Sequence, residues 1–138
     1  MTITKQKGDI AEAYVTYLLR DKGFKVLIPW GEDNRYDIVT EKNGIFKRVQ
    51  VKYATPQNGT LEVRIRSCNN YSVTRYSPKD VDIIAVYAAN INKVYFLPLS
   101  EIRNKSLVKL RLEPSRNNQK KFVILGTKYE SRFDLFEK

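Results

Sequence analysis

The chain has 138 residues, with 25 Lys and Arg against 15 Asp and Glu, so its formal charge of +10 favours a polyanionic partner, which we expect to be nucleic acid. It has no His and one Cys, which excludes an internal disulfide and a Cys/His zinc site and leaves only oxygen ligands for a metal ion. The length predicts a single domain over residues 1–138, and the absence of a signal peptide or of an apolar run of about 18 residues predicts a cytoplasmic protein.

The first predicted element is a helix over residues 5–22. Apolar residues such as Ile10 and Tyr14 recur there at helical spacing, and Gly23 is a suitable residue to end the helix. Glu12 lies at the edge of the apolar stripe, where a carboxylate needs a partner or solvent. This position is compatible with a functional acid and also with an ordinary solvated residue or ion pair.

A strand over residues 24–28 is followed by a hairpin that turns at Asn43-Gly44, because a type I′ turn needs two residues that tolerate positive φ. With a two-residue loop, counting back along the strands places Asp37 opposite Gln50. Side chains alternate along a strand, so Lys52 shares the face of Gln50. The hairpin therefore predicts that a carboxylate, an amide and an ammonium group converge. The core side of the hairpin is expected to carry Ile38, Val49, Val51 and Tyr53.

The rest of the chain predicts mainly strands. Residues 81–87 are continuously apolar except for Asp82, which indicates a central strand covered on both faces. Residues 61–66 alternate, with Arg64 and Arg66 on the open face, either as a solvated edge or as a phosphate contact. Further elements are expected at 94–99, at a short helix capped by Ser100, at 108–112, at 122–125 and in a helical tail over 129–136.

Several basic, amide and aromatic side chains could contact DNA, through phosphates or through base edges. The polar stretches 67–76 and 116–121 suit such loops, and they also suit ordinary surface. The candidates are Arg48, Arg64, Arg66, Arg75, Tyr76, Arg111, Arg116, Asn117, Asn118, Gln119 and Lys120.

The hairpin residues are those that phosphodiester hydrolysis needs. A divalent ion polarises the phosphate and lowers the pKa of an attacking water, and Mg²⁺ (or Mn²⁺) typically takes one or two protein carboxylates. Asp37 would be the main anionic ligand, with oxygens from Gln50 and the Val51 carbonyl, and Glu12 would reach the ion directly or through water. Lys52 would position or deprotonate the water. The alternative is a surface ion-pair network worth roughly 0 to 1 kcal/mol.

Asp37, followed after twelve residues by Gln50-Val51-Lys52 and preceded by a helix that contains Glu12, resembles the motif of the PD-(D/E)XK nuclease superfamily. Tyr36 stands in place of the Pro of that motif, and Gln50 in place of its second acid. The Gln-x-Lys form is similar to that of homing endonucleases associated with group I introns, as are stretches 76–82, 95–99, 110–112 and 117–119. Stretches 7–12 and 22–24 also look like archaeal Holliday junction resolvases, which usually carry Glu-x-Lys.

The resemblance implies an α/β, restriction-endonuclease-like fold. Its mixed central sheet carries the N-terminal helix in an αβββαβ-type core, and the second helix can be reduced. It implies a Mg²⁺-dependent endonuclease with homing-type cleavage of double-stranded DNA. A Holliday junction resolvase and a non-catalytic DNA-binding relative, in which Gln50 weakens metal binding, are the alternatives. Since cutting both strands with one site per chain needs several copies, a homodimer or homotetramer is expected.

Overall fold

The structure, a computed structural model, describes residues 3–68, 73–75, 78–102, 106–113 and 124–138. It begins with helix α1, Ile3–Asp21, whose buried residues recur every fourth position at Ala11, Val15 and Leu19. The helix ends as predicted at Gly23, where φ is +92° and the backbone N–H donates to the carbonyl of Arg20. None of the helices in the described ranges is long and apolar enough to cross a membrane.

A five-stranded mixed sheet forms the centre of the fold, in the order β1-β2-β3-β7-β8. Neighbouring strands are antiparallel except for β3 and β7, which are parallel. All six residues of β7 are buried, which confirms the prediction of a central strand covered on both faces. The strands are β1 (Lys25–Leu27), β2 (Ile38–Lys42), β3 (Ile45–Tyr53), β7 (Ile83–Ala88) and β8 (Lys93–Pro98).

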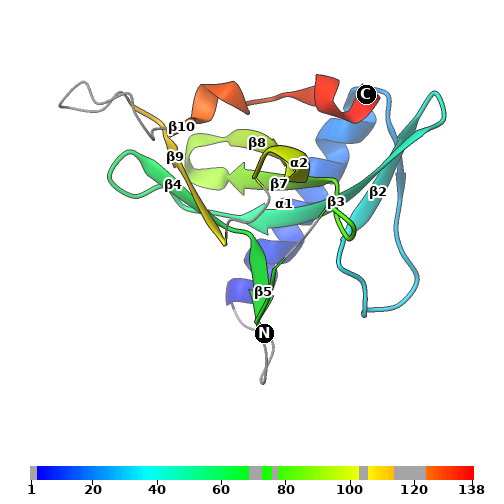
Figure 1. Cartoon of the computed structure of the whole chain (residues 1–138), viewed down its shortest axis with the longest axis horizontal. Helices are drawn as coiled ribbons and strands as arrows, with labels where there is room; N and C mark the ends of the chain where they lie inside the picture. The colour runs from blue at the N-terminus through cyan, green and yellow to red at the C-terminus, as the bar shows by residue number, and fades with distance from the viewer. Residues whose placement is uncertain (1–2, 69–72, 76–77, 103–105, 114–123) are drawn as a thin grey trace.

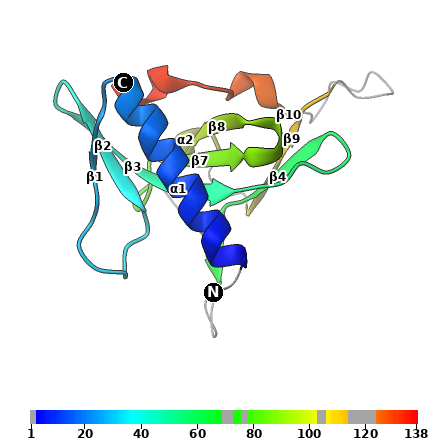
Figure 2. The same ribbon diagram turned by 180° about the vertical axis from the view of Figure 1, so that it is seen from behind.

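Each face of the sheet has its own core. Helix α1 packs on the face that carries Ile83 and Ala85 of β7, and it crosses that face diagonally (Figure 2). The opposite face, with Ile84 and Val86, is covered by a smaller sheet in the order β10-β9-β4 (Figure 1). Its strands are β4 (Thr60–Arg64), β9 (Leu107–Arg111) and β10 (Ile124–Leu125).

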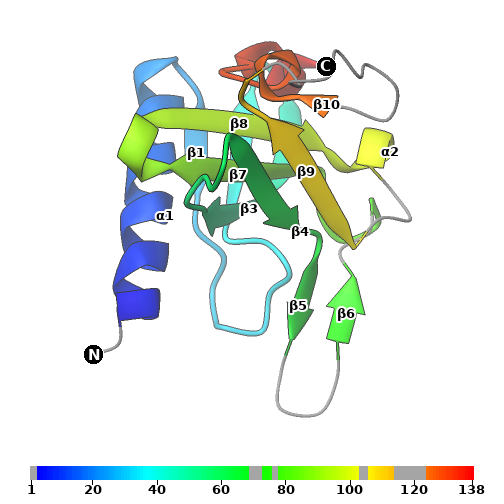
Figure 3. The same cartoon turned by 90° about the vertical axis from the view of Figure 1, so that its left-hand side faces the viewer.

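The second helix of the expected core is indeed reduced. The described residues between β3 and β7 form β4 and a hairpin of β5 (Arg66–Cys68) and β6 (Val73–Arg75) instead of a helix. This hairpin projects from the body on the same side as the loop between β1 and β2 (Figures 1 and 3).

The only α-helix after β8 in the described ranges is α2 (Leu99–Ile102). It starts one residue before Ser100, so Ser100 lies inside the helix and the predicted cap is wrong. The N–H of Leu99 donates to the carbonyl of Asp82 at 3.0 Å.

The helix predicted over 129–136 is confirmed only in its second half, as the 3-10 helix η3 (Phe133–Glu137), because residues 129–132 are not helical. Two other 3-10 helices are η1 (Ala89–Ile91) and η2 (Gly126–Lys128). Phe136 is fully buried, with its ring centroid 5.5 Å from that of Phe24 and 4.9 Å from that of Phe96. The tail therefore closes the α1 side of the sheet. Of the predicted strand over 122–125, residues 122 and 123 lie outside the described ranges.

Candidate active site

The hairpin of β2 and β3 has the predicted register. Lys42 faces Ile45 around Asn43 and Gly44, which both have positive φ, and the pairing continues to Ile38 and Val49. Both of these residues are fully buried, as expected for the core side. The pairing of β2 with β3 and its register thus follow from the Asn-Gly turn.

The two strands separate at Asp37, immediately before β2. The pairing ends at Ile38 and Val49, so Asp37 and Gln50 do not form the next pair of the ladder as expected. Instead, the Asp37 N–H donates to the Val49 carbonyl at 2.8 Å, and Asp37 Oδ2 accepts a hydrogen bond from the Val51 N–H at 2.8 Å. A side-chain carboxylate has taken the place of a strand partner. Asp37 is still held beside the Gln50–Lys52 segment, as the register argument required.

Burial and neighbouring charges control the protonation of Asp37. Burial raises its pKa, and the hydrogen bond from Val51 and the positive charge of Lys52 oppose that rise without cancelling it. Lys52 and Gln50 are both half-buried on β3. The structure therefore brings Asp37 and Lys52 close enough for their charges to interact.

Glu12 joins this group from α1. Its carboxylate is half-buried, and its pKa is raised by burial first, then by the negative charges of Asp37 and Asp9, against the charge of Lys5. The helix thus places a second acid within electrostatic range of the first. The sequence pattern could not separate this role from an ordinary solvated Glu, because the contact depends on how α1 packs on the sheet.

The donor set suits a hard divalent cation. In the described ranges there is no group of three or more His, Cys, Asp or Glu side chains placed to hold a metal ion. A cation here would be held by two carboxylates, Asp37 and Glu12, with neutral oxygens from Gln50 and the Val51 backbone. This all-oxygen set with two acids fits Mg²⁺. Burial raises the pKa of both acids, and the charges of Asp37 and Asp9 add to the rise at Glu12. A bound cation would favour the ionised form of both carboxyls.

A second polar cluster on β3 was missed by sequence reasoning. The Arg48 guanidinium donates to both carboxylate oxygens of Asp82, at 3.1 and 3.0 Å, and to the carbonyls of Pro78 and Lys79. The Arg48 backbone N–H also donates to Asp82 Oδ2 at 2.7 Å. We call this the Arg48–Asp82 clamp. The one available signal was the single acid, Asp82, in an otherwise apolar stretch.

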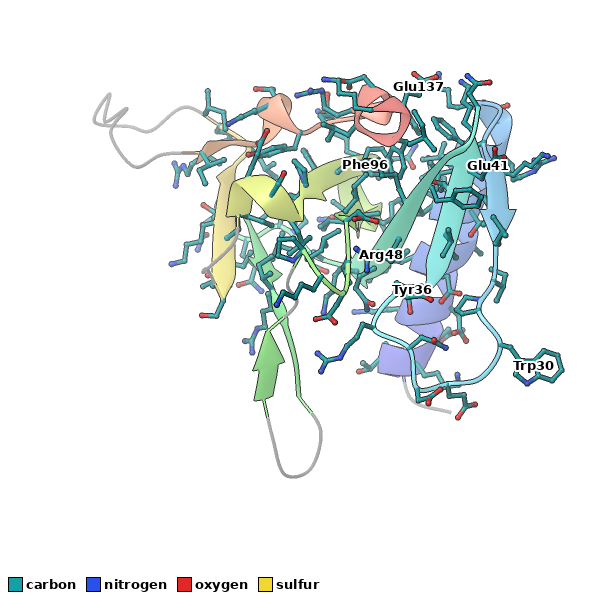
Figure 4. All side chains as sticks on the ribbon, turned by 45° about the vertical axis from the view of Figure 1, so that its right-hand side comes forward. Trp30, Tyr36, Glu41, Arg48, Phe96 and Glu137 are labelled. Atoms are coloured by element: carbon teal, nitrogen blue, oxygen red, sulfur yellow. The ribbon has the colours of Figure 1, made fainter. Side chains whose placement is uncertain are left out.

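The clamp alters the prediction that Arg48 contacts DNA. Four of its five guanidinium N–H groups are already used by Asp82, Pro78 and Lys79, and Arg48 lies within the fold (Figure 4). Burial raises the pKa of Asp82, but hydrogen bonds and charge from Arg48, together with Lys47, outweigh burial and leave this pKa below its usual value. The clamp joins the middle of β3 to the residue that precedes β7.

The other predicted DNA contacts are distributed over the smaller sheet and the projecting hairpin. Arg64 is exposed on β4, and Arg111 on β9 donates to Thr60 at 3.2 Å while its buried Nε has no partner among the described residues. Arg66 and Arg75 face each other across the β5–β6 hairpin. Six further candidates lie outside the described ranges: Tyr76, Arg116, Asn117, Asn118, Gln119 and Lys120.

Comparison with known proteins supports the resemblance drawn from the motif. A solved structure of a bacterial homing endonuclease, I-Ssp6803I, superposes with a TM-score of 0.78 and 26% identity, covering 97% of this chain and 93% of that one. Protein 5.3 of Escherichia phage T7 is 35% identical over 83 residues, which are 57% of this chain and 68% of that protein. The family model of the PD-(D/E)XK endonucleases matches residues 2–132, nearly the whole chain. With the fold and the Asp37 to Lys52 segment in place, the chain belongs to the PD-(D/E)XK endonuclease family.

Proposed function

We propose that the protein is a metal-dependent endonuclease that cleaves double-stranded DNA at a specific site, with homing-type action. The observation that supports the proposal is the Asp37 carboxylate, which accepts a hydrogen bond from the Val51 N–H where β2 and β3 separate and lies within electrostatic range of Lys52 and Glu12. Gln50 precedes Val51 on β3, and the structural neighbour of the chain is a homing endonuclease. The charge of +10 agrees with a DNA substrate.

Each residue has a role in this proposal. Asp37, Glu12, the Gln50 side chain and the Val51 carbonyl would hold Mg²⁺ or Mn²⁺, which supplies a Lewis acid for the phosphate and lowers the pKa of bound water. Lys52 would orient the attacking water as an ammonium group, or take its proton at Nζ as the neutral amine. The hydrogen bond from Val51 to Asp37 fixes one carboxylate oxygen, so the remaining one keeps a constant direction toward the ligand.

The path of the DNA is proposed from the shape of the molecule. The β5–β6 hairpin projects from the body (Figure 3), and Arg66 and Arg75 are partners in its backbone register. We propose that this hairpin and the exposed Arg64 of β4 contact DNA phosphates. Because both strands must be cut, we also propose that the active form is a homodimer or homotetramer.

The test uses purified protein with a supercoiled plasmid, a long DNA that contains candidate targets, and a four-way junction, each with Mg²⁺ or with EDTA. We expect Mg²⁺-dependent cuts at defined positions in the long DNA, and loss of these cuts in the Asp37→Ala and Lys52→Ala variants. Asp21→Ala, which removes an exposed acid at the end of α1, is the matched control and should cleave normally. Unchanged activity of the Asp37 or Lys52 variant would refute the site.

Two other outcomes would favour the alternatives. Cleavage confined to the junction would indicate a resolvase. Binding without cleavage under any metal would indicate a DNA-binding relative in which Gln50 has weakened the metal site.

DNA affinity should fall steeply with salt. Lys and Arg contacts release condensed counterions, so contact with about six phosphates predicts a loss of about 10³-fold in affinity between about 50 and 200 mM salt. Fluorescence anisotropy with labelled duplex at a series of salt concentrations measures the slope. A flat response would contradict the electrostatic basis of the proposal.

A further inference from the structure

Large apolar side chains are exposed along one border of the main sheet. Leu27 in β1 is 45% exposed, Ile28 is 65%, Trp30 in the next loop is 100%, and Phe46 in β3 is 60%. We call these four residues the edge strip. Single exposed apolar residues are ordinary, but several along one border of a charged protein mark a contact surface.

The strip lies where the fold leaves its main sheet uncovered. β1 is the outermost strand, and it pairs with β2 only on its inner side. Lys25, Glu41 and Phe46 form one row across β1, β2 and β3, and Leu27 lies one pleat further on the same face. Leu27 and Phe46 both line a groove of about 520 Å³ at this border.

Trp30 extends the strip away from the body, and its ring points out into solvent (Figure 4). Its loop has a defined shape, because the Asn34 side-chain amide donates to the carbonyls of Trp30 and Gly31, both at 3.4 Å. A fully exposed Trp gains most from burial in a protein interface, where Trp is the residue type most enriched among energetic hot spots.

Charge decides what covers the strip. The loop after Trp30 has two exposed acids, Glu32 and Asp33, and one exposed cation, Arg35, so it is net negative and repels DNA phosphates although the chain as a whole is basic. A basic surface on a partner protein would attract these two acids. The groove itself is lined by charges of both signs, Arg20 and Lys25 on one hand and Glu41 on the other. Across a two-fold axis such a groove is self-complementary, since each cation can meet the acid of the other copy.

We propose that the edge strip is the contact with a second copy of this chain. The proposal rests in part on the proposed function, because cutting both strands of a duplex needs two active sites. The loop that carries Trp30 leads directly into Asp37, so contact through this loop would fix the distance between the two catalytic carboxylates. The nearer the contact lies to Asp37, the less freedom remains between the two sites.

Trp30 is the only Trp of the chain, so its fluorescence reports on this surface alone. The experiment measures the emission wavelength of Trp30 and the sedimentation coefficient of the chain at a series of protein concentrations. It contains no DNA or metal, so its outcome does not depend on nuclease activity. We expect a dimer or larger species with blue-shifted emission at high concentration, and a red shift on dilution. Leu27→Lys should raise the dissociation constant at least about tenfold, or about 1.4 kcal/mol.

Ile10→Lys is the matched control, because Ile10 is 48% exposed but lies on α1. It should associate like the unmodified chain. Trp30→Ser, followed by sedimentation alone, provides a second variant if Leu27→Lys does not fold.

Three results would overturn the proposal. The first is a chain that remains monomeric at about 100 μM, where even weak dimers form. The second is association that is unchanged in both edge-strip variants. The third is Trp30 emission that does not depend on protein concentration and changes only when DNA is added. The last would assign Trp30 to nucleic acid. If association is confirmed but cleavage is never found, only the proposed nuclease function fails.

Discussion

Two half-buried aspartates flank β3, one on each side, and they behave in opposite ways. Asp37 lies before β2 and accepts a hydrogen bond from the Val51 N–H at 2.8 Å. Asp82 lies before β7 and accepts one from the Arg48 N–H at 2.7 Å. Both carboxylates therefore hold the backbone of the same strand. The pKa of Asp37 is nevertheless raised, and the pKa of Asp82 is lowered.

The difference between them is a guanidinium group. Burial raises the pKa of both acids. Asp82 forms a bidentate pair with the Arg48 guanidinium, which outweighs burial. Among the described residues, the only opposing positive charge at Asp37 is that of Lys52, and the acid Glu12 lies within electrostatic range. An acid whose charge is already compensated stabilises the fold. An acid whose charge is poorly compensated costs stability and is ready to bind a cation. The comparison indicates a structural role for Asp82 and supports the metal-binding role proposed for Asp37.

The largest effect that this comparison predicts is on catalysis. Asp37→Asn should reduce DNA cleavage by about 10³-fold or more, because the main anionic ligand is lost while the amide oxygen can still accept the hydrogen bond from Val51. The free energy of unfolding should not fall, since a neutral side chain avoids the cost of burying a charge. Plasmid cleavage and urea unfolding of the same preparation measure both quantities.

Asp21→Asn is the control, because it removes an equal charge from an exposed position at the end of α1. If Asp37→Asn lost several kcal/mol of stability, Asp37 would be a structural acid like Asp82, and the comparison would fail.

Asp82→Ala should have the opposite profile, because it should lower the free energy of unfolding rather than the rate of DNA cleavage. In kcal/mol its effect should be smaller than the effect of Asp37→Asn on cleavage. It removes the hydrogen-bonded partner of Arg48, whose side chain is 32% exposed, and leaves a half-buried cation with only carbonyl partners. We expect a loss of about 2 kcal/mol in the free energy of unfolding, at the low end for breaking a buried pair. Urea unfolding at neutral pH measures it.

The cost of this change should shrink as pH falls below 3.8, the ordinary pKa of Asp, because Asp82 contributes stability only while it is ionised. An Arg48→Met, Asp82→Leu double variant that recovers part of the loss would confirm that the unpaired charge causes it. A loss below about 0.5 kcal/mol would place the clamp among ordinary surface ion pairs.

The two aspartates also differ in how far the sequence predicts them. Asp37 was placed beside Gln50 and Lys52 by counting back from Asn43-Gly44, because a two-residue turn fixes a local register. The departure at Asp37, where a side chain replaces the strand partner, was not predictable from pairing rules. Asp82 and Arg48 are 34 residues apart, on strands joined through β4 to β6, so no local pattern relates them. Local periodicity predicted α1 and β7, while the covering sheet depends on contacts between distant segments.

The smallest predicted effect concerns Glu12, the second acid near Asp37. Burial, with the charges of Asp37 and Asp9, raises its pKa above the ordinary 4.5. The folded state therefore binds this proton more tightly than the unfolded chain does. The resulting stability is complete below pH 4.5 and is lost as pH rises through the raised value. Near neutral pH the ionised Glu12 is a net cost, which a neutral side chain should remove.

Glu12→Gln should accordingly raise the melting temperature slightly at pH 7, with the gain disappearing below about pH 4.5. Calorimetry of both chains from pH 4 to 8 measures the difference. Glu32→Gln, an exposed acid in the loop before Asp37, controls for the change in net charge and should show no such dependence. A gain that is the same at every pH would mean that packing, rather than ionisation, is responsible. A loss at pH 7 would mean that the Glu12 charge is compensated like that of Asp82, and the contrast with the Arg48–Asp82 clamp would then be confined to Asp37.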